Sequence, residues 1–102
     1  MSWTRIAAVA DCPPGTCLEA VAGGHIVALF NVDGTFYALD GVCPHQGGPL
    51  GRGELEGCIV TCPWHGWQFD VRTGQHQLSP SIVQPHMPVR VEADAVLVDI
   101  GG

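Results

Sequence analysis

The sequence predicts an all-β protein, because breaker residues are abundant, short β-prone runs recur, and no helical period is sustained. The chain of 102 residues contains 14 Gly and 8 Pro, which disfavours a helical bundle or a coiled coil. Hydrophobic residues make up 46% and charged residues 14%, a balance typical of folded domains. At this length we expect one domain spanning residues 1–102.

Two hairpins are predicted where turn residues separate β-prone runs. Runs 25–32 and 35–39 flank Asp33-Gly34, a dipeptide that favours a two-residue hairpin. Runs 89–92 and 95–100 are separated by two residues in the same way. Three further short strands are expected at 3–9, 58–61 and 67–71.

Two tracts interrupt the strand pattern with glycine and proline. They cover residues 40–57 and 74–88, and neither shows a helical 3.6-residue period. Loops of this length in a compact domain usually carry function. We therefore expect the functional residues to lie in or beside these tracts.

The charge balance excludes two classes of partner. Four arginines and no lysine stand against 10 acidic residues, for a net charge of -6, whereas phosphate binding needs clustered cations. Nucleic acid and anionic membrane surfaces are therefore not expected as partners. No run approaches the roughly 20 apolar residues of a membrane span, and the apolar run after Arg5 is too short for a secretory signal. We expect a cytoplasmic protein.

Each of two glycine-rich segments contains one cysteine and one histidine. Cys43 and His45 are separated by one residue, Cys62 and His65 by two, and sixteen residues lie between the pairs. Two thiolates and two imidazoles suit one tetrahedral zinc, or one [2Fe–2S] cluster with cysteines on one iron and histidines on the other. Unrelated loop residues are a third interpretation. The spacing favours a metal centre.

The same segments resemble the Rieske family. The likeness is carried by Cys43-Pro-His-Gln-Gly-Gly-Pro-Leu50, by Cys62-Pro-Trp-His-Gly-Trp-Gln-Phe-Asp70, and by Arg72-Thr-Gly74. It implies a Rieske-like antiparallel β-sandwich with a two-loop cluster-binding subdomain and one [2Fe–2S] cluster. The loops would span about 41–50 and 61–67. The resemblance further implies that Cys43 and Cys62 hold the inner iron, and His45 and His65 the outer iron near the surface.

Four positions place the chain more finely within that family. Within the family that the sequence resembles, proteins of respiratory and photosynthetic complexes have a disulfide between two loop cysteines. The matching positions in this sequence are Gly48 and Trp64. Trp67 and Phe69 stand where those proteins have hydroxyls that donate hydrogen bonds toward the cluster. Fewer donors stabilise the reduced cluster less, so we expect a potential low in the range of about -150 to +300 mV. The pattern is similar to that of the small ferredoxins of ring-hydroxylating dioxygenases.

The resemblance implies a soluble, monomeric one-electron carrier and not an enzyme. Its partners would be a flavoprotein ferredoxin reductase and a terminal aromatic-ring-hydroxylating oxygenase. Two alternatives remain at this point: an electron-transfer small subunit of a larger oxidoreductase such as nitrite reductase, and a non-redox, zinc-stabilised interaction domain. We expect docking at the histidine side, surrounded by Pro44, Gln46, Gly48, Pro49, Trp64 and Trp67.

The remaining candidate residues favour structural interpretations. Cys12 and Cys17 could form a disulfide or bind a second metal, but ordinary thiols around a turn are favoured, and Cys58 is expected to be a buried small residue. Trp3 and Phe30 are expected in the core. The other histidines, expected to be structural or solvent-facing, are His25, His76 and His86. The acidic residues near the loops, expected on a solvated surface or steering a partner, are Asp40, Glu54, Glu56 and Asp70.

Overall fold

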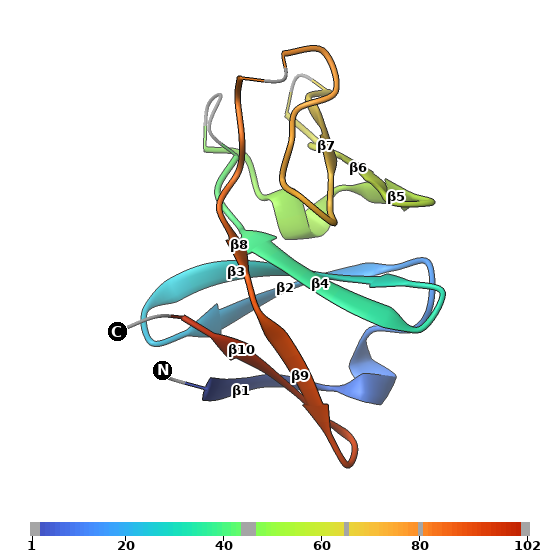
Figure 1. Cartoon of the computed structure of the whole chain (residues 1–102), viewed down its shortest axis with the longest axis vertical. Helices are drawn as coiled ribbons and strands as arrows, with labels where there is room; N and C mark the ends of the chain where they lie inside the picture. The colour runs from blue at the N-terminus through green and yellow to red at the C-terminus, as the bar shows by residue number, and fades with distance from the viewer. Residues whose placement is uncertain (1–2, 44–46, 65, 80, 101–102) are drawn as a thin grey trace.

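The computed structural model describes residues 3–43, 47–64, 66–79 and 81–100. Their strands form three antiparallel sheets, and these residues contain no α-helix, only two three-residue 3-10 turns, Val9–Asp11 and Leu50–Arg52. Two of the sheets make a sandwich toward one end of the long axis, and the third, the small sheet, lies toward the other end (Figure 1). The predicted all-β class and antiparallel sandwich are confirmed.

The sheets combine strands that are distant in the sequence. The first sheet, in the order β1-β10-β9, consists of β1 (Trp3–Ala8), β10 (Ala95–Asp99) and β9 (Val89–Glu92). The second, in the order β2-β3-β4-β8, consists of β2 (Cys17–Ala22), β3 (His25–Val32), β4 (Thr35–Asp40) and β8 (His86–Met87). The small sheet, in the order β5-β6-β7, consists of β5 (Glu54–Glu56), β6 (Ile59–Thr61) and β7 (Gln68–Asp70).

Both predicted hairpins form, with turns that require left-handed backbone. Between β3 and β4, Asp33 has φ 51° and Gly34 has φ 92°, the pattern of a primed turn whose twist matches the strands. Between β9 and β10, Ala93 has φ 54°. The two short strands predicted at 58–61 and 67–71 also form, as β6 and β7.

Three strands that local sequence does not indicate are formed through pairing. β2 contains Glu and Ala, residues depleted in strands, yet all six of its residues pair with β3. β5 and β8 lie in the tracts expected to be irregular and pair with β6 and β4. The expectation that Trp3 lies in the core is wrong: it is half-buried, and the Arg90 guanidinium lies 4.2 Å from its ring centroid.

The hydrophobic core continues from the sandwich into the base of the loops. Val27 and Val98 are among the fully buried residues between the two large sheets. A second cluster joins Phe30 of β3 to Phe69 of β7, and both rings are fully buried. The loop cysteines are part of this second cluster, so packing of the sandwich determines where they lie. The prediction that Phe30 is in the core is confirmed.

Candidate metal centre

The two predicted ligand cysteines are buried at the top of the second core cluster. Cys43 follows β4 and is 2% exposed, and Cys62 follows β6 and is 1% exposed. Neither forms a disulfide, and both pack with Phe69 and Leu50 in one cluster. The two cysteines, nineteen residues apart in the sequence, thus lie in the same hydrophobic cluster.

The first loop, residues 41–50, is closed by its own backbone. The Cys43 amide donates to the Gly48 carbonyl at 2.9 Å, and the Gly47 amide donates back to the Cys43 carbonyl at 2.9 Å. Below them, the Leu50 amide donates to the Gly41 carbonyl at 2.9 Å. These bonds fix the backbone on both sides of Cys43. The backbone that carries the thiol of Cys43 is therefore fixed by the loop itself.

The second loop, residues 61–67, is the turn of the β6–β7 hairpin. Thr61 pairs with Gln68 at its base, and the Cys62 amide donates to the Trp67 carbonyl at 2.8 Å. Gly66 has φ 73°, in the left-handed region, which glycine adopts without steric cost. The hairpin therefore presents Cys62 at the end of a short strand.

Gly48 is the residue through which the two loops meet. A Cβ atom built on Gly48 would lie 2.8 Å from the Cys62 Sγ and 2.9 Å from the Trp64 Cβ. Only a residue without a side chain allows the first loop to approach the second thiol this closely. Gly48 is buried, so it does not belong to the exposed docking face expected from the sequence.

A third segment, residues 74–85, supports both loops from one side. Gln84 is 2% exposed and its side-chain Nε2 donates to the carbonyls of Asp40 at 2.6 Å and Val42 at 2.7 Å. His76 packs edge-on to Trp67 at a ring-centroid distance of 4.6 Å. No local pattern singles out Gln84, because its partners are distant in the sequence. It was missed as a supporting residue for that reason.

Two backbone amides fix the orientation of the His76 ring. Its Nδ1 accepts hydrogen bonds from the amides of Leu78 at 3.0 Å and Ser79 at 3.1 Å. The ring is 7% exposed and also packs edge-on to Phe69. The expectation of a structural role is confirmed for His76, whereas His25 and His86 are exposed.

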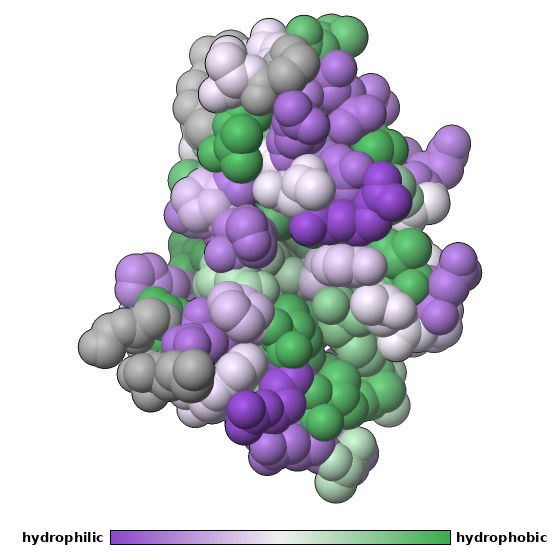
Figure 2. Space-filling view, viewed as in Figure 1, coloured by the Kyte–Doolittle hydropathy of each residue, from purple (hydrophilic) through white to green (hydrophobic). Residues whose placement is uncertain are grey.

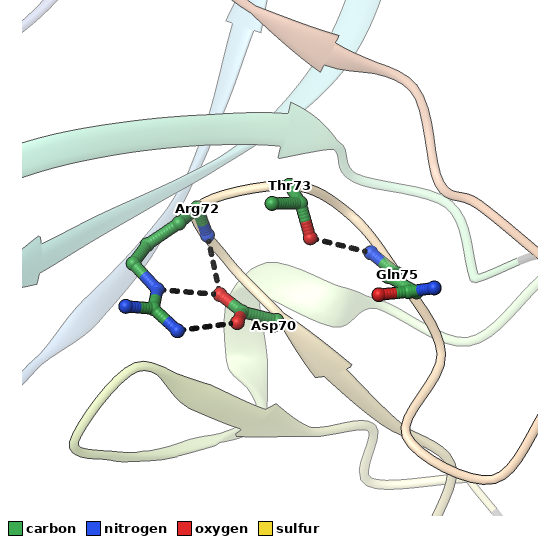
Figure 3. A network of polar contacts seen from close by, with 4 residues as sticks. All are labelled: Asp70, Arg72, Thr73 and Gln75. Atoms are coloured by element: carbon green, nitrogen blue, oxygen red, sulfur yellow. Dashed lines mark hydrogen bonds and ion pairs between the residues drawn. The ribbon is translucent and has the colours of Figure 1, made fainter. Parts of the chain in front are cut away.

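The turn that follows β7 is fixed by an ion pair. The Asp70 carboxylate accepts from the Arg72 amide at 2.9 Å and from the Arg72 guanidinium at 3.0 and 2.8 Å (Figure 3). These bonds hold the pKa of Asp70 below its usual value. Next to them, the Gln75 amide donates to the Thr73 hydroxyl. The turn leads the chain from the second loop into residues 74–85.

The other cysteines are ordinary thiols. Cys12 is fully buried and its thiol donates to the Thr16 carbonyl, while the Cys17 thiol donates to the Gly53 carbonyl at 3.0 Å. Burial raises the pKa of both thiols. Neither forms a disulfide. Cys58 is half-buried against the second core cluster, so it is less enclosed than expected.

The described donors fit the predicted cluster. Two cysteines that form no disulfide belong to one core cluster, and Gly48 provides the close approach that a group shared by both loops requires. Paired thiolates are the ligands of the inner iron of a Rieske centre. His45 and His65, the predicted imidazole ligands, lie outside the described residues.

Comparison with known proteins identifies the family. The Rieske [2Fe-2S] domain family matches residues 2–93. The chain belongs to the Rieske [2Fe–2S] family. It is 39% identical over 102 residues to the biphenyl dioxygenase ferredoxin subunit of Pseudomonas sp. (strain KKS102), covering 97% of this chain and 93% of that protein. A zinc-stabilised interaction domain is set aside, since Rieske membership implies one [2Fe–2S] cluster per chain.

Solved Rieske structures share the whole fold. The Sphingomonas yanoikuyae B1 ferredoxin has a TM-score of 0.88 at 30% identity, over 98% of this chain and 100% of that one. A chain from the complex of reduced oxygenase and oxidised ferredoxin in carbazole 1,9a-dioxygenase has a TM-score of 0.84 at 33% identity. The match covers 94% of this chain and 91% of that one. This Rieske protein is therefore a ferredoxin component of the dioxygenase type, an electron-transfer protein and not a catalytic subunit.

Proposed function

We propose that this Rieske ferredoxin takes single electrons from a flavoprotein reductase and delivers them to a terminal aromatic-ring-hydroxylating oxygenase in the cytoplasm. The supporting observation is that two buried cysteines belong to one core cluster in a chain related over its full length to dioxygenase ferredoxins. The cluster supplies a one-electron couple whose net charge changes by one unit. The protein's own residues hold it, limit water and form the docking surface.

We assign the ligands residue by residue from the motif. Cys43 and Cys62 would hold the inner iron, because their thiols are sealed within the core, where thiolate ligands are shielded from water. His45 and His65 would hold the outer iron as neutral imidazoles. One ligand pair from each loop means that both loops must be in place before the site is complete. Loading of the cluster would therefore stabilise the fold.

Apolar side chains at the loop end provide the contact surface in this proposal. Val42 of the first loop is 43% exposed and Trp64 of the second is 49% exposed. Leu78 is 87% exposed at the rim of an open pocket of about 410 Å³, which Trp67 and Ile82 also line. Contact with a partner here would expel water next to the ligand positions. Partner and cluster would then approach closely enough for electron transfer.

Two exposed carboxylates on β5, which pairs with the strand leading into the second loop, are available to steer a basic partner. Asp70 is paired with Arg72 and the Asp40 carboxylate accepts from the Val42 amide, whereas Glu54 and Glu56 of β5 are exposed. Hydrophilic residues predominate over the small sheet on the face drawn in Figure 2. With a net charge of -6, the protein would attract a basic surface over a distance of about 10 Å at 0.1 M salt.

The cluster is tested by spectroscopy on the purified protein. We expect a brown protein with two irons and two acid-labile sulfides per chain, and a reduced electron paramagnetic resonance signal with the low average g value of a histidine-ligated cluster. A colourless protein without labile sulfide would overturn the proposal. Co-purification with a sirohaem enzyme would instead indicate a subunit of a larger oxidoreductase.

Electron delivery is tested by the rate of oxygenase reduction at increasing ionic strength. We expect the rate to fall as salt rises, and the double variant Glu54→Gln/Glu56→Gln to flatten that dependence. The matched control is Asp33→Asn/Asp94→Asn, which removes the same charge from exposed hairpin turns of the sandwich. Equal salt dependence in both double variants would show that β5 does not steer docking.

A further inference from the structure

Gln84 makes a contact that neither the motif nor the family assignment explains. It lies in the proline-containing segment after the second loop, yet its side chain is 2% exposed. Its Nε2 donates to the Asp40 carbonyl at the end of β4, at 2.6 Å, and to the Val42 carbonyl in the first loop, at 2.7 Å. Since both neighbours are acceptors, the amide nitrogen and not the oxygen must face them. Gln84 therefore donates two hydrogen bonds through one side-chain nitrogen.

The Val42 carbonyl belongs to the peptide group that leads directly into Cys43. The other end of this peptide group, the Cys43 amide, donates to the Gly48 carbonyl at 2.9 Å. The peptide plane is therefore fixed at both ends, by Gln84 on one side and by Gly48 on the other. Its orientation determines where the Cys43 Cα, and hence the thiol, is placed.

The backbone of Gln84 is itself anchored to the turn that leaves the second loop. Its amide donates to the Gly74 carbonyl at 2.7 Å, and the Gly74 amide donates to the Asp70 carbonyl at 2.7 Å. Any side chain at position 74 would collide with the Gln84 carbonyl. On the other side, the Asp40 amide donates to the Pro85 carbonyl at 2.8 Å. The residue thus connects the end of β7 to the start of the first loop.

We propose that Gln84 is a positioning residue that fixes the first ligand loop relative to the second and so limits reorganisation at the cluster. This inference rests on the proposed electron-transfer function. A buried amide that satisfies two carbonyls resists movement, because displacing it leaves both acceptors unpaired. With the peptide before Cys43 held still, the ligand geometry changes little between the oxidised and reduced protein.

The test compares Gln84→Met with Gln77→Met in the purified, cluster-loaded protein. Methionine keeps the length and volume at position 84 and removes both donors, whereas Gln77 is exposed and serves as the matched control. For Gln84→Met we expect at least tenfold faster hydrogen exchange in residues 41–50, equivalent to about 1.4 kcal/mol of local opening free energy. We also expect broadened lines in the electron paramagnetic resonance spectrum.

The reduction potential separates positioning from a purely structural role. Loss of two donor dipoles beside the first loop should disfavour the more negative, reduced cluster. We expect the reduced-to-oxidised ratio at a fixed ambient potential to fall at least threefold, about 28 mV for a one-electron couple. Unchanged linewidth, exchange and potential, with only a lower melting temperature, would overturn the inference.

A second variant covers failure of the first to fold. Gln84→Glu has the same length, and in its neutral form it can donate to only one of the two carbonyls. We expect its loop exchange rate to be faster than that of the wild type and, where Gln84→Met folds, slower than that of Gln84→Met. A wild-type exchange rate in Gln84→Glu would refute the inference. A wild-type protein without a cluster would refute the proposed function itself.

Discussion

Replacement of Gly48 by alanine tests the convergence of the two loops most directly. The added Cβ would lie 2.8 Å from the Cys62 Sγ and 2.9 Å from both the Cβ and Cγ of Trp64. Cβ contacts this short are essentially never observed. The half-exposed Trp64 ring can turn outward, but the Cys62 thiol is 1% exposed and enclosed by core residues. The first loop must therefore move away from Cys62.

The cost in stability follows from two opposing effects. Overpacking of a buried site costs about 1–3 kcal/mol, and the smaller conformational entropy of alanine in the unfolded chain offsets about 0.4–1 kcal/mol. We expect a net loss of about 1–2 kcal/mol in the free energy of unfolding. The larger effect is on the cluster, since a displaced first loop moves Cys43 relative to Cys62.

Gly57→Ala provides a control of similar cost at a distance from the loops. Gly57 is in the β5–β6 turn at φ 61°, with open space where a Cβ would stand. A left-handed alanine costs about 1–2 kcal/mol, offset by the same entropy gain. Iron, labile sulfide and visible absorption are measured together with thermal unfolding. We expect Gly48→Ala to lose most of its cluster and Gly57→Ala to retain it. Full cluster content in Gly48→Ala would refute the convergence argument.

Three further outcomes are expected. His65→Ala should lose its iron and melt at a lower temperature, because metal binding and folding are coupled, whereas the exposed His25→Ala should retain both; iron analysis and calorimetry decide this. Asp70→Asn should make the free energy of unfolding depend less on pH in the acid range. In the wild type, the lowered pKa of folded Asp70 stabilises the protein above the unfolded pKa of about 3.9. This contribution is lost as pH falls through the folded pKa. Titrated unfolding between pH 2 and 6 measures it. The midpoint potential should lie below about +100 mV, because Trp67 and Phe69 carry no hydroxyl; redox titration would contradict this with a clearly higher value.

Local chemistry was sufficient to predict the two hairpins. Asp33 and Gly34 adopt the left-handed conformations that their turn requires, and this preference is a property of the residues themselves. The cysteine positions were also readable, since ligand types and spacings are written in consecutive residues. Features of this kind depend on neighbours within a few positions. The two hairpins are confirmed, and the ligand assignment stays a prediction.

Contacts between distant segments could not be read in the same way. β2 is a strand because β3 offers a paired edge, although its Glu19 and Ala20 are weak strand formers. Gln84 donates to Asp40 and Val42, which precede it by 44 and 42 positions in the sequence. Nothing in a proline-containing segment marks it as a donor to another part of the chain. Likewise, Gly48 was expected on the surface, yet it is buried because the second loop folds over it.

The loops combine a sealed side and an open side within a few residues, and this combination suits a carrier. Cys43 and Cys62 are almost fully buried, while the adjacent Val42 and Trp64 are about half exposed. Burial of the thiol side keeps water from reorganising around the charge that arrives with the electron. Exposure of the neighbouring side chains gives a partner an apolar surface close to the same charge. Gly48 approaches the Cys62 thiol on one side of this boundary, and Gln84 holds the peptide before Cys43 on the other, so these two residues connect the sealed side to the open side.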